Sequence, residues 1–168
     1  MVNIIKLRKG LDIKLSGEAE KKKIQLKSNG KYCLSPVDFV GVTPKVVVKE
    51  GDHVKAGSAL FINKNCSELK FSSPVSGKVT AVVRGDRRKV LGIVVEADDK
   101  QEYVDYGVKN VDRMSGDEVI NLLLEAGLFG YINQLPYDVV ACPTDKPKAI
   151  FVSALRDKPL ASDFEFEL

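Results

Sequence analysis

The stretch Val46–Phe61, VVVKEGDHVKAGSALF, places two apolar runs on either side of a polar turn that contains glycine. A second stretch of this kind follows at Ser72–Gly85, SSPVSGKVTAVVRG, in which Pro74 and Gly77 precede another run rich in β-branched residues. Valine and its β-branched relatives favour strands, whereas glycine, proline and aspartate favour the turns between strands. Both stretches therefore predict short strands joined by tight turns.

The same pattern extends from Lys45 to Ala97. Five strands are expected, each bounded by turn residues: Lys45–Glu50, Ala59–Asn63, Glu68–Ser73, Lys78–Val83 and Val90–Ala97. Short strands at this spacing are typical of a β-sandwich or barrel. No helix is expected between Lys78 and Ala97. The turns are expected to use glycine at positive φ, where it has no steric cost, at Gly51, Gly57, Gly77 and Gly85.

Lys64 lies in the loop INKNCSELKF, between two of these expected strands. This layout resembles domains that carry biotin or lipoate on a hairpin lysine, so residues 31–98 are expected to form a biotinyl/lipoyl-like barrel-sandwich hybrid. Biotin carriers place the lysine between two methionines, and lipoate carriers usually place it after an aspartate. Lys64 has neither flank. We therefore expect the fold without a covalent cofactor, and a carrier modified at Lys64 is the alternative.

After this β-rich region the pattern becomes helical. The stretch Ser115–Leu128, SGDEVINLLLEAGL, has Ser115 and Glu118 at the spacing of a capping box, apolar residues at helical spacing, and Gly127 as a stop. A loop rich in prolines and aromatic residues is expected next. The run Ala149–Ala154, AIFVSA, is typical of a buried strand, which needs neighbours on both sides. The sequence is therefore expected to be truncated.

Composition argues against several classes of function. The chain has 168 residues, of which 44% are hydrophobic and 29% charged, as in globular proteins. No apolar run approaches the ~20 residues that span a bilayer, and the charged start MVNIIKLRKG does not fit a signal peptide. A net charge of +3 is too small to indicate binding to nucleic acid.

The potential metal ligands are few and scattered. Cys33, Cys66 and Cys142 show no CxxC spacing, and His53 is the only histidine. A closed metal site or a disulfide framework would need more ligands or paired cysteines. We expect no metal site and no catalytic residue in this chain.

Five segments together resemble a known family. They occur in this order: LRKGLDIKLSGEAE (Leu7–Glu20), VGVTPKVVVKEGDHVKAGSALF (Val40–Phe61), FSSPVSGKVTAVVRGDRRKVLGIVVE (Phe71–Glu96), LLLEAGLF (Leu122–Phe129) and AIFVSALRDKPLASD (Ala149–Asp163). The ordered set resembles the amino-terminal part of the A-subunit of the bacterial sodium-translocating NADH:quinone reductase. The resemblance implies an N-terminal arm at 1–30, the β-domain at 31–98, a helix and connecting loop at 99–148, and the start of a truncated Rossmann-like domain at 149–168.

The resemblance also implies a function. Family members are expected to be peripheral components on the cytoplasmic face of the bacterial inner membrane, in a complex that oxidises NADH, reduces quinone and exports sodium. Its flavins and iron–sulfur centre reside on other subunits, while the A-subunit is associated with quinone binding. The partners implied are those other subunits and quinone, and the isolated fragment is not expected to be catalytic. A second alternative is the C-subunit of the related ferredoxin:NAD electron-transfer complex, whose cysteine clusters lie further along.

The candidate site lies in Leu128–Val140, LFGYINQLPYDVV, where glycine and proline exclude a regular helix or a central strand. Apolar side chains in such a loop either pack on a core or cover a partner. Tyr131, Leu135 and Tyr137 are the candidate quinone- or partner-binding residues, because tyrosine offers an apolar ring and a hydroxyl donor. The resembling family typically has an arginine before the proline, where this chain has Leu135, so no role of that arginine is carried over.

Overall fold

The computed structural model describes residues 15–17, 20–25 and 29–152. The chain divides into two compact units: one is Ser28–Lys146, and the other combines Met1–Lys27 with Pro147–Leu168. In the second unit, the described residues form neither helix nor strand. The strand expected at Ala149–Ala154 does not form over Ala149–Val152, because a strand needs a neighbour to hydrogen-bond and no described residue pairs with this segment. Its last two residues lie outside the described ones.

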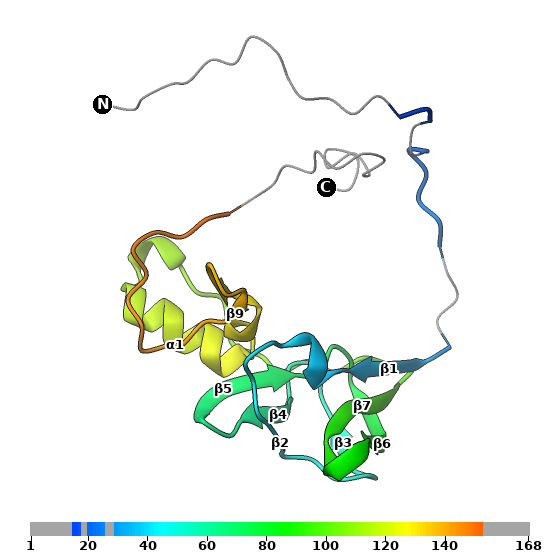
Figure 1. Ribbon diagram of the computed structural model, residues 1–168. Helices are drawn as coiled ribbons and strands as arrows, with labels where there is room; N and C mark the ends of the chain where they lie inside the picture. Colours follow the sequence, from blue (N-terminus) through cyan, green and yellow to red (C-terminus); the bar gives the residue numbers. More distant parts are fainter. Residues whose placement is uncertain (1–14, 18–19, 26–28, 153–168) are drawn as a thin grey trace. The chain divides into compact units, whose positions relative to one another are not determined.

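Two antiparallel sheets form the body of Ser28–Lys146 (Figure 1). The first sheet has the order β1-β7-β6-β3, and its strands are β1 (Lys31–Leu34), β7 (Val90–Ala97), β6 (Gly77–Arg84) and β3 (His53–Val54). The second has the order β2-β4-β5, and its strands are β2 (Pro44–Val46), β4 (Ala59–Asn63) and β5 (Cys66–Ser72). The mainly β architecture expected from the sequence is confirmed.

Some strand boundaries differ from those expected. The strand expected at Lys45–Glu50 ends at Val46, because the Lys49 backbone N–H donates to the Asp52 carboxylate (2.7 Å) and so serves a turn instead of a ladder. Neither β1 nor β3 was expected. The two-residue β3 is too short to show the alternation by which strands are recognised.

The turn between β6 and β7 corrects one glycine prediction. Gly51, Gly57 and Gly77 have positive φ as expected, but Gly85 has an extended backbone with φ −100°. The left-handed residues are instead Arg87 (φ 53°) and Arg88 (φ 62°), within the single 3₁₀ turn η2, Asp86–Arg88. The turn η2 lies within Lys78–Ala97, where no helix was expected. Its central residues have left-handed backbone angles, so its geometry is that of a β-turn. The reason for the difference is that the hairpin reverses two residues later than the glycine.

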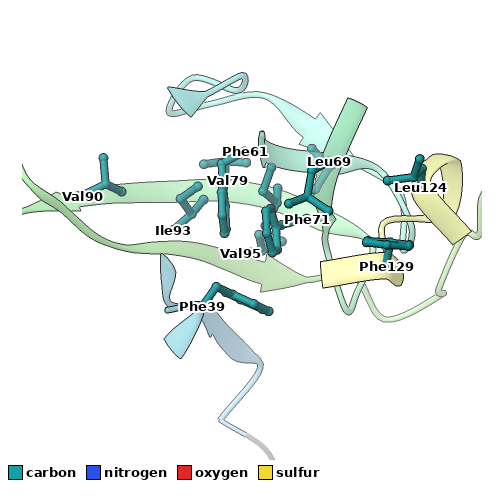
Figure 2. Packing of buried hydrophobic residues seen from close by; sticks show 12 residues of the cluster. Phe39, Phe61, Leu69, Phe71, Val79, Val90, Ile93, Val95, Leu124 and Phe129 are labelled. Atoms are coloured by element: carbon teal, nitrogen blue, oxygen red, sulfur yellow. The ribbon is translucent and has the colours of Figure 1, made fainter. Parts of the chain in front are cut away.

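A group of phenylalanines forms the centre of the core (Figure 2). The rings of Phe61 and Phe71 are stacked, with centroids 4.4 Å apart and planes 9° apart, and both side chains are buried. Phe39, which follows the short turn η1 (Pro36–Asp38), lies against both rings, at centroid distances of 6.0 Å and 4.4 Å. Val79 and Ile93 of the β6–β7 hairpin belong to the same cluster. Burial of these side chains is the main stabilising term for the unit.

A segment after β7 is tied to the barrel by polar contacts. The Ser76 side chain is fully buried, and its hydroxyl accepts from the Glu102 backbone N–H at 2.8 Å. The Gln101 amide oxygen accepts from the Ser76 backbone N–H at 2.7 Å, and its nitrogen donates to the Ser76 carbonyl at 3.2 Å. Tyr103 then forms a bridge with Ala56. The backbone groups and the hydroxyl of the buried Ser76 therefore each have a hydrogen-bond partner, as expected of buried polar groups.

The helix α1, Gly116–Ala126, follows the short turn η3, Val111–Arg113. Its expected capping box is confirmed: Ser115 accepts from the Glu118 backbone N–H, while the Ser115 N–H donates to the Glu118 carboxylate at 2.7 Å. That donated hydrogen bond lowers the pKa of Glu118. Gly127 ends the helix in the left-handed conformation, as expected. Within the described residues, no helix has the length and apolar content that crossing a bilayer requires.

Candidate functional site

The region after α1 is a short hairpin on a buried support. The turn η4, Phe129–Tyr131, buries the Phe129 side chain in the core cluster. The strands β8 (Asn133–Gln134) and β9 (Val139–Val140) then pair antiparallel. We call residues 128–140 the aromatic hairpin. This segment was expected to be an irregular loop. The structure adds a two-residue strand pair, and Pro136, which has no backbone N–H to donate, lies in the turn between the two strands.

Three contacts hold the aromatic hairpin in place. The Asn133 side-chain amide donates to the Asp138 carboxylate at 2.8 Å across the hairpin. The Val140 backbone N–H donates to the Val40 carbonyl at 3.0 Å, which fixes β9 to the segment after η1. The Ala141 N–H donates to the Ile132 carbonyl at 2.8 Å. The hairpin is therefore an ordered part of the unit, with a defined orientation for its side chains.

The three predicted site residues all point to solvent. Tyr131, Leu135 and Tyr137 expose 63%, 66% and 77% of their surface. The Tyr131 ring stands edge-on to Phe39, with centroids 5.4 Å apart, whereas Tyr137 has no ring contact within the described residues. The structure therefore places all three on one hairpin, with Tyr131 supported by the core and the other two at the tip.

Sequence reasoning missed the contribution of an early segment to this site. Phe39 supports Tyr131, and the neighbouring Val37 and Val40 are exposed apolar residues. They come from the stretch around η1, which is joined to β9 by the Val40 hydrogen bond. The apolar residues of SPVDFVGV (Ser35–Val42) were visible in the sequence. Nothing in the local sequence, however, connects this segment to the aromatic hairpin, which lies about ninety residues later.

The exposed side chains of this surface are mostly aromatic and aliphatic. The surface offers aromatic and aliphatic area with phenol hydroxyls as hydrogen-bond donors, which is the composition of protein and ligand contact sites. Among the described residues, the pKa of Tyr106 is displaced as well as that of Glu118, but Tyr106 lies outside the aromatic hairpin. Burial, aided by the Glu125 carboxylate, raises the pKa of Tyr106, whose hydroxyl donates to the Gly57 carbonyl at 3.1 Å. Its role is therefore structural.

The potential metal ligands are separated. Among the described residues, no group of three or more His, Cys, Asp or Glu side chains is placed to hold a metal ion. Cys33, Cys66 and Cys142 are free thiols. His53 forms a 2.8 Å contact between its Nε2 and the Asp98 carboxylate, on an exposed part of the first sheet.

Lys64 occupies the two-residue turn of the β4–β5 hairpin, together with Asn65. Its backbone N–H donates to the Thr43 carbonyl at 2.8 Å, and its side chain is exposed. Geometry alone would thus permit a carrier lysine at this place. What this chain lacks is the methionine or aspartate flank that modifying enzymes meet in carrier domains.

We predict that Lys64 is unmodified. The intact mass of the purified chain should equal the mass calculated from its sequence, because nothing beside Lys64 reproduces the flanks of a carrier lysine. Mass spectrometry of the chain expressed with active lipoyl and biotinyl ligases provides the measurement. A digest peptide that contains Lys64 with a lipoyl or biotinyl increment would contradict the prediction.

The fold defines a class of protein: a two-sheet domain of the barrel-sandwich hybrid type, with an attached helix and a hairpin that exposes aromatic and apolar side chains. Comparison with known proteins gives the family. Residues 5–98 match the model of the NqrA N-terminal barrel-sandwich hybrid domain, and residues 114–168 match the NqrA second alpha/beta domain. The barrel-sandwich hybrid expected from the sequence is thereby confirmed. The chain belongs to the NqrA family.

Several curated relatives are named as the A-subunit of the Na(+)-translocating NADH-quinone reductase. The protein of Yersinia pseudotuberculosis is 34% identical over 166 residues, and that of Neisseria meningitidis serogroup B is 33% identical over 162 residues. The Pseudomonas aeruginosa protein is 32% identical over 162 residues. Each match covers 95% of this chain and 36% of the relative. The chain therefore spans about a third of the length of these relatives.

Proposed function

We propose that this chain is the N-terminal part of an NqrA protein in a sodium-translocating NADH:quinone reductase, and that it contributes to quinone binding and to assembly of the complex. In this proposal it is a peripheral component on the cytoplasmic face of the bacterial inner membrane, in a complex that couples NADH-driven quinone reduction to sodium export. The names of the relatives support the assignment to this complex. The exposed apolar side chains of the aromatic hairpin support the contact role, and this observation carries the proposal.

The chain is proposed to be non-catalytic and to bind no cofactor, with flavins and the iron–sulfur centre on other subunits. The scattered cysteines and the single histidine support this proposal for metal and iron–sulfur centres, because such centres need clustered ligands. The C-subunit of the ferredoxin:NAD complex is less well supported, since the relatives are named for the sodium-translocating reductase. The division into 1–30, 31–98, 99–148 and 149–168, with a Rossmann-like domain from residue 149, is likewise a proposal.

Two roles of the aromatic hairpin fit its exposure. In the first, Tyr131, Leu135 and Tyr137 pack against a downstream domain of full-length NqrA. In the second, they contact quinone or a neighbouring protein of the complex, and a tyrosine hydroxyl donates to a quinone carbonyl oxygen. The second role is favoured by Tyr131, whose ring rests on Phe39 at 5.4 Å while more than half of the residue remains exposed. A supported ring of this kind loses little side-chain entropy on binding.

The test is to place Tyr131→Ala and Tyr137→Ala in full-length NqrA and to assay the assembled complex. We expect the KM for quinone to rise severalfold, while NADH oxidation by artificial acceptors stays unchanged, because those acceptors bypass the quinone. Tyr103→Ala is the matched control, since Tyr103 is exposed but lies outside the hairpin. Unaltered quinone kinetics in a complex that assembles normally would leave only the packing role.

A further inference from the structure

The turn between β6 and β7 places two arginines in backbone conformations that arginine rarely adopts. The Lys89 backbone N–H donates to the Asp86 carbonyl at 3.1 Å, so residues 86–89 form a β-turn. Its two central residues are Arg87, with φ 53° and ψ 30°, and Arg88, with φ 62°. These angles are those of a type I′ turn, for which Asn-Gly is the preferred pair because other side chains are strained there. Stability alone does not explain two consecutive arginines at these positions.

The same turn concentrates positive charge. Four exposed cations, Arg84, Arg87, Arg88 and Lys89, lie within six residues that contain one carboxylate, Asp86. None of the four forms an ion pair with another described residue, and Arg84 donates only to the Arg88 carbonyl, at 3.3 Å.

A further acid contacts β6 but forms no ion pair with these four cations among the described residues. The Glu50 carboxylate accepts instead from the Val82 backbone N–H, at 2.9 Å. Exposed apolar side chains, Val83 and Leu91, flank the cations on the two strands. Figure 1 shows this turn at the end of the unit opposite to α1. We call residues 83–91 the basic tip.

We propose that the basic tip binds the surface of an anionic lipid bilayer. Cations that are clustered beside exposed apolar side chains match the interface of such a membrane, where lipid phosphates attract the charges and the acyl boundary receives the apolar groups. Left-handed φ at two arginines lets both side chains project from the very end of the hairpin. The strain of the turn is thus explained by the position that it gives to the charges.

A bilayer fits this tip better than an acidic protein surface does. Specific protein interfaces bury about 800 Å² on each partner and are enriched in aromatic residues. A two-residue turn is too narrow and convex to bury such an area, and the basic tip contains no aromatic residue. Lipid headgroups, by contrast, adapt to a convex cationic end. The inference rests on the proposed function only in placing the chain beside a membrane.

The experiment measures co-sedimentation of the full 168-residue chain with vesicles. One set of vesicles contains phosphatidylglycerol in phosphatidylcholine, and the other contains phosphatidylcholine alone. The variant Arg87→Asn/Arg88→Gly installs the preferred turn and removes two charges. We expect its partition onto anionic vesicles to fall by about tenfold to thirtyfold. Its Tm should rise by roughly 5 °C, because strain is removed. Loss of binding with a gain in stability cannot result from unfolding.

The matched control is Lys45→Gln/Lys64→Gln, which removes the same charge from exposed positions of the second sheet. Its partition should stay within about twofold of the parent chain, because screening confines the effect to charges near the bilayer. An equal loss in this control, unchanged binding of the turn variant, or equal binding to neutral vesicles would overturn the proposal. So would a turn variant that keeps vesicle binding but no longer joins the complex, which would indicate an acidic protein partner. Quinone kinetics of the tyrosine variants are measured separately, so either proposal can fail alone.

Discussion

Replacing Phe71 by alanine should lower the free energy of unfolding of the Ser28–Lys146 unit by about 3–5 kcal/mol, the usual cost of removing a buried phenylalanine. Phe71 is expected to give a large value because its ring meets neighbours on several sides. It stacks on Phe61 at 4.4 Å, meets Phe39 at 4.4 Å and lies beneath the backbone of Gly130. No single neighbour can move to fill the space that is left.

Urea unfolding followed by circular dichroism gives the measurement, with the slope of the transition compared between variants. Phe151→Ala is the matched control, since it removes the same side chain from an exposed position, and it should change stability by less than about 0.5 kcal/mol. A loss below about 1.5 kcal/mol for Phe71→Ala, at an unchanged slope, would show that the phenylalanine cluster does not dominate the core.

The elements predicted correctly are those that depend on residues close together in the sequence. Ser115 and Glu118 indicated the start of α1, and Gly127 its end, because capping depends on residues within one turn. The β6–β7 hairpin was predicted because both strands are long and rich in β-branched residues. The residues with positive φ inside its turn were not predicted, since Gly85 is the residue that prefers a positive φ while Arg87 and Arg88 adopt it.

Contacts between distant segments could not be predicted in this way. The candidate residues Tyr131, Leu135 and Tyr137 were found from their apolar character in a segment broken by glycine and proline. Their support was not found, because Phe39 precedes the β-rich stretch and its packing against Tyr131 depends on the complete fold. The sequence therefore indicated the candidate side chains, but it left open whether they pack or face solvent, and it did not show what holds them in position.

The two surfaces of the unit have different physical characters, and this difference makes their roles separable. The aromatic hairpin is supported from below by Phe39 and Phe129 and presents tyrosine rings. The basic tip presents cations on a strained turn, and its binding should fall steeply with salt. Contact through the hairpin should be much less sensitive to salt, because it depends on apolar area. Salt titration of complex assembly and of vesicle binding should therefore give different profiles.

The contact between Gly130 of the aromatic hairpin and the Phe71 ring can be tested by adding a single methyl group. Gly130 carries no side chain, and a Cβ built on it would lie against the Phe71 ring, 3.0 Å from Cζ, 3.1 Å from Cδ1 and closer still to Cε1. Gly130→Ala should therefore destabilise the unit by about 1–3 kcal/mol, the range for overpacking a close-packed core. Gly116→Ala is the matched control. Gly116 has nothing within 4 Å of the added methyl, and alanine favours the helix.

A double-mutant cycle decides whether the ring is the cause. In a Phe71→Leu background the planar ring is gone, so Gly130→Ala should cost much less than in the parent chain, with a coupling energy of about 1 kcal/mol or more. If the aromatic hairpin has the proposed quinone role, the single variant should also weaken quinone binding in the complex, because Tyr131 follows Gly130 directly, and Phe71→Leu should partly restore it. If Gly130→Ala costs the same in both backgrounds, the contact with Phe71 does not position the hairpin. The requirement for glycine would then lie in the backbone of η4 itself.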